Sequence, residues 1–198
     1  MTKDLSKIEE ELLQIKQDVI DCKKCPLWEG RILPVIGSGS HQAKVLFIGE
    51  APGANEDKTG VPFCGTSGKI LDSILEKIDI KREDVYICNI LKCRPPKNRD
   101  PLKGEIDICT GYLERQIEAI QPDVICTLGR FSMAYIMERF GLKNLIEPIS
   151  KIKGKVFETD FFSKKIKIIP LYHPAVAAYN GGKRKELEED IKVLSQFK

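Results

Sequence analysis

The sequence of 198 residues lacks any long uninterrupted apolar run. Its opening MTKDLSKIEEELLQIKQDVI mixes acidic, basic and apolar side chains, which excludes a signal peptide and a membrane span there. We therefore expect a soluble, cytoplasmic protein with no membrane contact. Internal repeats, low-complexity segments and linkers are also missing, so a single domain over residues 1–198, acting as a monomer, is predicted.

A strong excess of one charge is also missing, since 32 Lys and Arg stand against 29 Asp and Glu. A net charge of +3 does not by itself indicate a polyanionic partner. The basic residues are nevertheless clustered, between Lys92 and Lys103 and again at positions 183–185. Either cluster alone is equally well explained as a solvated loop, but both lie beside loops that carry motifs.

The seven cysteines are an odd number without a secretory signal, which argues against a disulfide framework. Cys22 and Cys25 form a C-x-x-C pair suited to metal binding, but no second such pair completes a zinc ribbon. Cys93 and Cys109 lie far down the chain. Spacing alone leaves zinc, an iron–sulfur cluster and no metal about equally open. Three other cysteines lie in or beside apolar sequence and are interpreted as small core residues: Cys64, Cys88 and Cys126.

Apolar periodicity predicts an α/β fold. Residues recur at helical spacing over 6–20, and four later apolar runs have the length of buried strands. Helical patterns lie between these runs, which predicts a parallel sheet covered by helices on both faces. The predicted strands are 44–49, 85–90, 124–128 and 166–171, and the predicted helices are 6–20, 67–77, 102–120, 130–140 and 185–196.

One segment, KIKGKVFETDFF at 151–162, breaks this alternation and is predicted to form a small antiparallel hairpin turning near Gly154 or Thr159. Elsewhere the loops after the strands matter most, because parallel sheets bind ligands outside the carboxyl ends of their strands. Those loops are GEAPGANED, LKCRPPKNRDP, GRFS and YHPAVAAYNGGKR.

The first loop holds Gly49 and Gly53, whose freedom permits tight turns close to a ligand. It continues through Asn55-Glu56-Asp57 and Gly60-Val61-Pro62-Phe63 to GTSG at 65–68, a helix start that offers N–H groups to phosphate. Alone it could be an ordinary loop. The sequence has no Walker pattern and no Rossmann G-x-G-x-x-G, which argues against a plain nucleotide-binding module.

Together with Asn89, the run KCRPPKNRDP and His173-Pro174, these motifs resemble the family-four uracil-DNA glycosylases, the iron–sulfur branch of the uracil glycosylase superfamily. The resemblance extends from Cys22 to about Arg184, with five motifs in the family's order. It implies a three-layer α/β/α sandwich with a central four-stranded parallel sheet. It also implies a [4Fe–4S] cluster, usually regarded as structural, on four cysteines: Cys22, Cys25, Cys93 and Cys109.

The activity implied by this resemblance is the excision of uracil from DNA, the first step of base excision repair. Such an enzyme flips the nucleotide out, hydrolyses the N-glycosidic bond and leaves an abasic site, without a lyase step. Phe63 would then stack on the base, while the Asn89 carboxamide would pair with uracil N3 and O4 and reject cytosine. His173 would donate a hydrogen bond to uracil O2.

The position that activates water in other branches of the superfamily is Ala51 here, which lines the expected uracil site but can activate nothing. Glu50 is therefore predicted to position the water or to stabilise the sugar cation. Glu56 is a second candidate carboxylate, which could hold the turn or the same water. An electron-transfer protein is the rival interpretation of the cysteines, but it leaves Phe63 and Asn89 unexplained.

The expected partner is uracil-containing DNA, single- or double-stranded, with a sliding clamp as a further candidate. Val176 or Tyr179 is the candidate wedge that replaces the extruded nucleotide. The 31% of charged residues hint at a thermophilic source. Predicted DNA contacts come from glycine, serine and arginine side chains or backbone in the motif loops: Gly65, Ser67, Arg94, Arg99, Arg130, Ser132 and Arg184.

Overall fold

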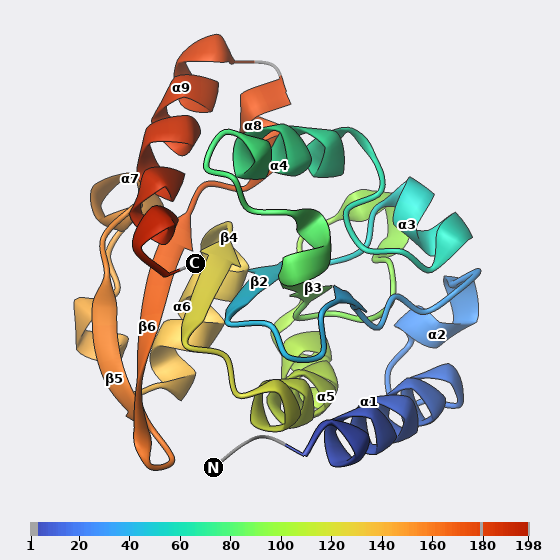
Figure 1. Ribbon diagram of the computed structural model, residues 1–198. Helices are drawn as coiled ribbons and strands as arrows, with labels where there is room; N and C mark the ends of the chain where they lie inside the picture. The colour runs from blue at the N-terminus through green and yellow to red at the C-terminus, as the bar shows by residue number, and fades with distance from the viewer. Residues whose placement is uncertain (1–3, 179, 198) are drawn as a thin grey trace.

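The computed structural model describes residues 4–178 and 180–197, and its centre is a six-stranded sheet in the order β1-β3-β2-β4-β6-β5 (Figure 1). The four inner strands are parallel, whereas β1 and β5 pair antiparallel at the two edges. The bounds are β1 Ser38–Gly39, β2 Val45–Gly49, β3 Tyr86–Asn89, β4 Val124–Leu128, β5 Phe157–Phe161 and β6 Lys164–Leu171.

The four predicted strands are confirmed as the parallel centre of the sheet, and the α/β class with them. The two edge strands differ from the expected four-stranded sheet. Strand β1 has two residues, too few to produce a periodic pattern, and β5 alternates between half-buried and exposed residues, as an edge strand does.

The hairpin predicted at 151–162 is wrong in its position. Its first residues belong to the short helix α7 (Ile149–Ile152), residues 153–156 form a turn and an irregular stretch, and Phe157–Phe161 forms β5, which pairs with β6. The chain turns at Phe162, whose φ of 51° is left-handed. A bulky residue rarely adopts this conformation, so nothing in the local residue pattern indicates a turn there.

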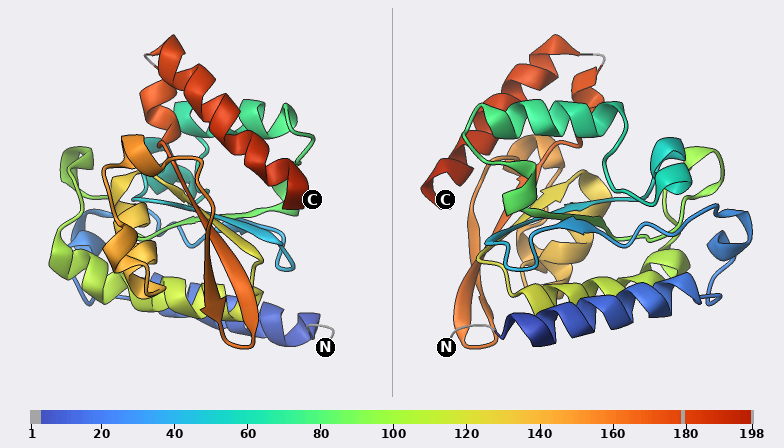
Figure 2. Two further views of the ribbon diagram at one scale, coloured as in Figure 1. Left: turned by 90° about the vertical axis from the view of Figure 1, so that its left-hand side faces the viewer. Right: turned by 45° about the vertical axis from the view of Figure 1, so that its right-hand side comes forward.

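Helices cover both faces of the sheet and make the three layers (Figure 2). Alternation along β2 explains this: Leu46 and Ile48 pack against α1, α5, α6 and α7, whereas Val45 and Phe47 pack against α4, α8 and α9. The helices are α1 Leu5–Ile20, α2 Leu27–Gly30, α3 Ala54–Thr59, α4 Thr66–Glu76, α5 Lys103–Ile120, α6 Arg130–Arg139, α8 Pro174–Ala178 and α9 Gly181–Asp190.

Short 3₁₀ helices lie in three of the connections, as η1 Arg82–Asp84, η2 Pro96–Asn98 and η3 Lys143–Leu145, and another, η4 Ile191–Phe197, follows α9. The predicted final helix, 185–196, is therefore α9 followed by η4. Within the described ranges, no helix combines the length and the apolar character needed to cross a membrane.

Helix α1 lies alongside α5 on one face of the sheet (Figure 2). Its buried stripe recurs at helical spacing, as predicted, and α5 adds a charged contact, because Arg115 pairs with Glu11 at 2.8 Å and with Asp18 at 2.5 Å. This packing delivers the end of α1, and hence Cys22, to the region of α5 that carries Cys109.

Candidate active site

A cavity of about 330 Å³ opens where β2, β3 and β6 end. Its walls come from three of the loops named from the sequence and from the start of α4. This is the place where a parallel sheet binds ligands. All the predicted catalytic and uracil-binding residues line it: Glu50, Ala51, Glu56, Phe63, Asn89 and His173.

Asn89 is the last residue of β3 and is 1% exposed. Its Oδ1 has no hydrogen-bond partner, one of two such buried side-chain atoms in the described residues; the other, Thr127 Oγ1, does not line the cavity. A buried acceptor without a donor costs free energy, about 1–3 kcal/mol. The unpaired oxygen at the cavity wall therefore calls for a ligand that donates a hydrogen bond.

Gly49 lies opposite Asn89 in the pairing of β2 with β3, and a side chain at this position would clash with its neighbours. A Cβ there would lie 2.3 Å from Asn89 Oδ1 and 2.7 Å from Phe63 Cζ. Only glycine lets the carboxamide and the aromatic ring approach the end of β2 this closely.

Phe63 is 6% exposed and has a left-handed backbone, with φ of 50°. Such a conformation costs roughly 1–3 kcal/mol and is retained where the surroundings impose it. Here Gly68 of α4 provides the room, since a Cβ at Gly68 would lie 1.6 Å from the Phe63 carbonyl oxygen. The ring packs in the core layer under α4 and also lines the cavity, 5.6 Å from the His173 ring.

His173 follows β6 and is held in one neutral form. Burial lowers its pKa to about 4, although the Glu56 carboxylate opposes this shift. The backbone N–H of Ala175 donates to His173 Nδ1 at 3.1 Å, so Nδ1 carries no proton. The neutral ring therefore carries its proton on Nε2 and can donate it to a ligand.

The two carboxylates beside the cavity have different surroundings. Glu56 accepts three backbone N–H bonds, from Gly53 to Oε2 and from Cys64 and Gly65 to Oε1, each at 3.1 Å. It therefore ties the loop before α3 to the loop before α4. Its hydrogen-bonding capacity is largely used for holding these loops and the Phe63 segment between them.

Glu50 accepts a longer bond, 3.3 Å, from the Phe131 N–H at the start of α6. Burial raises the pKa of Glu50, and the nearby Arg130 opposes that rise. Gly129, with φ of 104°, makes room, since a Cβ there would lie 2.4 Å from Glu50 Oε1. The carboxylate oxygens of Glu50 can therefore accept further hydrogen bonds, whereas those of Glu56 are largely occupied.

Ser67 and Arg99 line the cavity, but the predicted DNA-contacting arginines are already paired within the protein. Arg99 forms a two-pronged ion pair with Glu105, at 2.5 and 2.9 Å. Arg130 pairs with Asp100 at 2.5 Å, and Asp100 itself lines the cavity. Sequence reasoning missed these two acids as partners of the arginines, although Asp100 lies within the NRDP motif and Glu105 follows it.

The other predicted DNA contacts lie outside the cavity lining. Arg94 donates to Asn98 at 2.7 Å, and Arg184 donates to Ser73 at 2.9 Å. The backbone N–H of Gly65 is used by Glu56. Ser132 is fully buried and its hydroxyl donates to a backbone carbonyl, so this hydroxyl does not face a ligand. Among the wedge candidates, Val176 is exposed on α8 and Tyr179 lies outside the described residues.

The four cysteines of the predicted metal site, 22, 25, 93 and 109, line a separate, mostly apolar cavity between α1, α2 and α5. Two N–H donors point at their sulfurs: Arg31 Nη1 donates to Cys93 Sγ at 3.3 Å, and the backbone N of Lys92 donates to Cys109 Sγ at 3.2 Å. Burial raises the pKa of both thiols, that of Cys109 to about 11.

Four thiols around one space, with N–H donors to sulfur, are a donor set that fits an iron–sulfur cluster. No three His, Cys, Asp or Glu side chains within residues 4–178 and 180–197 gather closely enough to hold a single metal ion. Sequence reasoning missed Arg31 and Lys92, since neither belongs to a recognisable ligand pattern. Of the cysteines assigned to the core, Cys88 and Cys126 are fully buried and Cys64 is half-buried.

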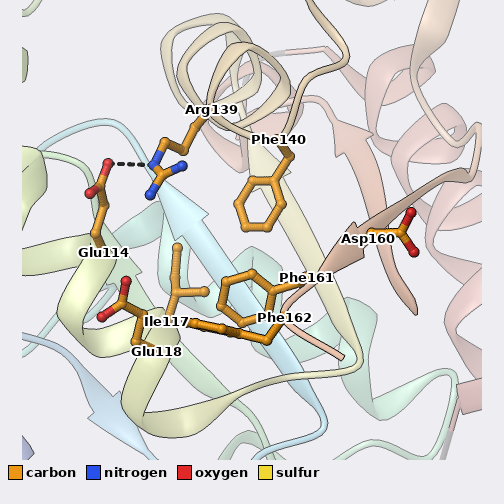
Figure 3. Close-up of a pocket in the computed structure, with 8 residues that line it drawn as sticks. All are labelled: Glu114, Ile117, Glu118, Arg139, Phe140, Asp160, Phe161 and Phe162. Atoms are coloured by element: carbon orange, nitrogen blue, oxygen red, sulfur yellow. Dashed lines mark hydrogen bonds and ion pairs between the residues drawn. The ribbon is translucent and has the colours of Figure 1, made fainter. Parts of the chain in front are cut away.

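A further cavity, of about 340 Å³, lies between α5, α6 and β5 (Figure 3). Three phenylalanines turn toward it, and Arg139 reaches across to Glu114, which accepts its hydrogen bond at 2.7 Å. None of the functional residues named from the sequence lines it. The candidate active site is therefore the cavity at the strand ends.

Because the chain holds two histidines, nitrogen-15 NMR can follow the His173 imidazole, with His173→Gln assigning its signal. We expect His173 to stay neutral, with its proton on Nε2, down to about pH 5. An unfolded histidine binds its proton near pH 6.5, so the stability due to neutral His173 is present above that pH and is lost as the pH falls through about 4. Titration near pH 6.5 in the folded protein would contradict this assignment.

Comparison with known proteins gives concordant results. A sequence model described as the uracil DNA glycosylase superfamily matches residues 36–197. The chain is similar to the Type-4 uracil-DNA glycosylase of Archaeoglobus fulgidus, with 46% identity over 95% of this chain and 94% of the relative. A Sulfurisphaera tokodaii protein of the same name is 46% identical over 94% of this chain and 84% of the relative. One from Thermotoga maritima is 40% identical over 95% of both chains. Because the superfamily model matches most of the chain, including every residue that lines the active-site cavity, the chain belongs to the uracil DNA glycosylase superfamily.

Proposed function

We propose that this protein removes uracil from DNA by hydrolysing the bond between the base and deoxyribose. The observation that carries the proposal is the unpaired Asn89 Oδ1, buried at the wall of a cavity that also presents Phe63 and a neutral His173. Relatives of similar length are named uracil-DNA glycosylases, which supports the same activity here. The cavity is complete within one chain, so we propose a single-domain enzyme that acts as a monomer.

Recognition follows from the direction of the missing hydrogen bond. Uracil carries a hydrogen on N3 and can donate it to Asn89 Oδ1, while the amide nitrogen of Asn89 donates to uracil O4. Cytosine has no hydrogen on N3, so it would leave the buried oxygen unpaired and is rejected. Phe63 supplies the stacking surface for the flipped base.

Bond cleavage places negative charge on the departing uracil and positive charge on the sugar. His173 donates its Nε2 hydrogen to uracil O2, where the negative charge develops, and needs no prior protonation for this. Water adds to C1′ as the bond from C1′ to N1 breaks, and the proton released by water ends on uracil. Glu50 keeps free acceptor capacity and is proposed to hold that water or to stabilise the sugar cation, while Glu56 positions the loops.

DNA phosphates are proposed to contact the rim of this cavity. Ser67 lies in the first turn of α4. Arg94 and Arg99 belong to the 93–101 loop, five of whose residues line the cavity, and Arg130 pairs with Asp100 of the same loop. Arg184 extends the contact along α9, and backbone groups near Gly65 and Ser132 complete it. Such contacts hold the duplex without reading its sequence and make affinity fall with rising salt.

A [4Fe–4S] cluster is proposed on Cys22, Cys25, Cys93 and Cys109, supported by their shared cavity and by the N–H donors to sulfur. When bound, it supplies a covalent tie between α1, α5 and the 93–101 loop rather than reaction chemistry. Iron analysis together with the visible absorption of iron–sulfur thiolates tests this. Zinc in a colourless, active protein would leave the glycosylase proposal standing and refute the cluster.

The activity itself is tested with labelled oligonucleotides that carry one uracil, followed by alkali, which cleaves abasic sites. We expect an alkali-labile product that depends on uracil, whereas the same oligonucleotides with cytosine or thymine stay intact. Strand cleavage before alkali would indicate a lyase step. The absence of alkali-labile product with fully loaded protein would refute the proposed function.

Glu50→Gln tests the proposed carboxylate. This change keeps the size of the side chain but removes its charge, so single-turnover cleavage should fall at least about tenfold, while DNA binding is retained. Glu118→Gln is the matched control, because Glu118 is exposed and lines the other cavity. Unchanged cleavage by Glu50→Gln would remove this residue from the chemistry.

Gly49→Ala tests the packing that positions Asn89 and Phe63. The added methyl group would displace one or both, so inhibition by free uracil should weaken by about tenfold or more. In the control Gly111→Ala, the new Cβ on this exposed residue of α5 meets no neighbouring side chain or distant backbone atom within 4 Å. That control should keep full uracil inhibition and gain about 0.5–1 kcal/mol of stability. Equal uracil inhibition in both variants would contradict the steric argument.

A further inference from the structure

Lys92 has no role in the mechanism, yet its side chain is fully buried, with an exposed fraction of 0%. Its Nζ donates to the backbone oxygen of Asn89 at 2.9 Å and to Gln116 Oε1 at 2.6 Å. Both acceptors are neutral, and Lys92 forms no ion pair within the described parts of the chain. A buried ammonium is costly unless an anion compensates its charge.

The surroundings of Lys92 identify where that anion belongs. Lys92 lines the cysteine cavity, and its own backbone N–H donates to Cys109 Sγ at 3.2 Å. Thiols that bind a metal lose their protons, and the negative charge of four thiolates exceeds the positive charge of the iron–sulfur core. An occupied cysteine site is therefore an anion beside Lys92.

Gln116 of α5 fixes the position of the Lys92 ammonium through its amide oxygen. Its amide nitrogen donates to the backbone oxygen of Ile36 at 3.0 Å and to the Tyr86 hydroxyl at 3.1 Å. The amide oxygen must then face Lys92, because the nitrogen is already engaged. Lys92 is thus held between α5, the cysteine cavity and the last residue of β3.

We propose that Lys92 is a positioning residue that compensates the charge of the cysteine-held cluster and, through the same ammonium, fixes the backbone of Asn89. This inference rests on the proposed function and on the proposed cluster. Asn89 reads uracil with its side chain, while its carbonyl oxygen is held by Lys92. Filling of the cysteine site therefore influences how firmly uracil is bound.

Lys92→Met tests this, because methionine keeps most of the apolar stem and removes the charge and the N–H donors. We expect an iron chelator to bleach the cluster at least tenfold faster than in the parent protein. The reduction potential of the cluster should become more negative, because a nearby cation no longer favours the added electron. Inhibition by free uracil should weaken about fivefold.

Lys153→Met is the matched control. Lys153 is also mostly buried, but it pairs with Asp190 at 2.9 Å and with Glu186 at 3.3 Å, and it does not line the cysteine cavity. Removal of the Lys153 charge should alter neither the reduction potential of the cluster nor the inhibition by free uracil.

A second test variant is Gln116→Glu, which keeps Lys92 but gives its ammonium a carboxylate partner. Bleaching of the cluster should again become faster, and the reduction potential of the cluster should again become more negative.

Parent-like bleaching and potential in both Lys92→Met and Gln116→Glu would overturn the charge role. Parent-like uracil inhibition in Lys92→Met would overturn the link to Asn89. If Lys92→Met does not fold, Gln116→Glu alone decides the charge role. An active parent protein without iron would overturn this inference while leaving uracil excision in place, so the two failures are distinguishable.

Discussion

The parallel pairing of β2 with β3, in which Gly49 lies opposite Asn89, sets the geometry on which the rest of the active site depends. Both strands end at this pair, so the loops that follow diverge from one point at the edge of the sheet. The missing side chain at Gly49 lets Phe63 and Asn89 share the space above it. A shift of one residue in this register would move Asn89 to the other face of the sheet.

The two glutamates beside the cavity illustrate how surroundings divide roles between identical side chains. Glu56 is saturated by backbone N–H groups and acts as a brace between two loops. Glu50 is half-buried and accepts fewer hydrogen bonds, and its partial burial raises its pKa. Such a carboxylate is poorly compensated until a cationic sugar or a water molecule lies beside it. Glu56 thus holds two loops of the cavity in place, while the Glu50 carboxylate remains able to accept further hydrogen bonds.

Much of this arrangement could be predicted from the sequence, because apolar runs and glycine-rich loops are local signals. The strands and the amphipathic α1 follow from such patterns, whereas the convergence of Asn89 and His173 on one cavity is expected from the family resemblance. The DNA-contacting and catalytic roles stay predictions. Other features depend on contacts between distant segments, such as the turn at Phe162, the pairing of Arg99 with Glu105 and the burial of Lys92. A lysine in a basic run indicates a solvated loop, and only the fold reveals that this one points inward.

The packing of α1 against α5 has a consequence for the order in which the chain assembles. Glu11 and Arg115, which join the two helices, are 104 residues apart in sequence. During synthesis α1 leaves the ribosome long before α5, the helix that covers its apolar stripe. Two of the four inner strands, β2 and β3, are made between the two helices, and the stripe stays exposed to solvent during that time. Helix α1 therefore cannot reach its final place until α5, far later in the chain, has also been made.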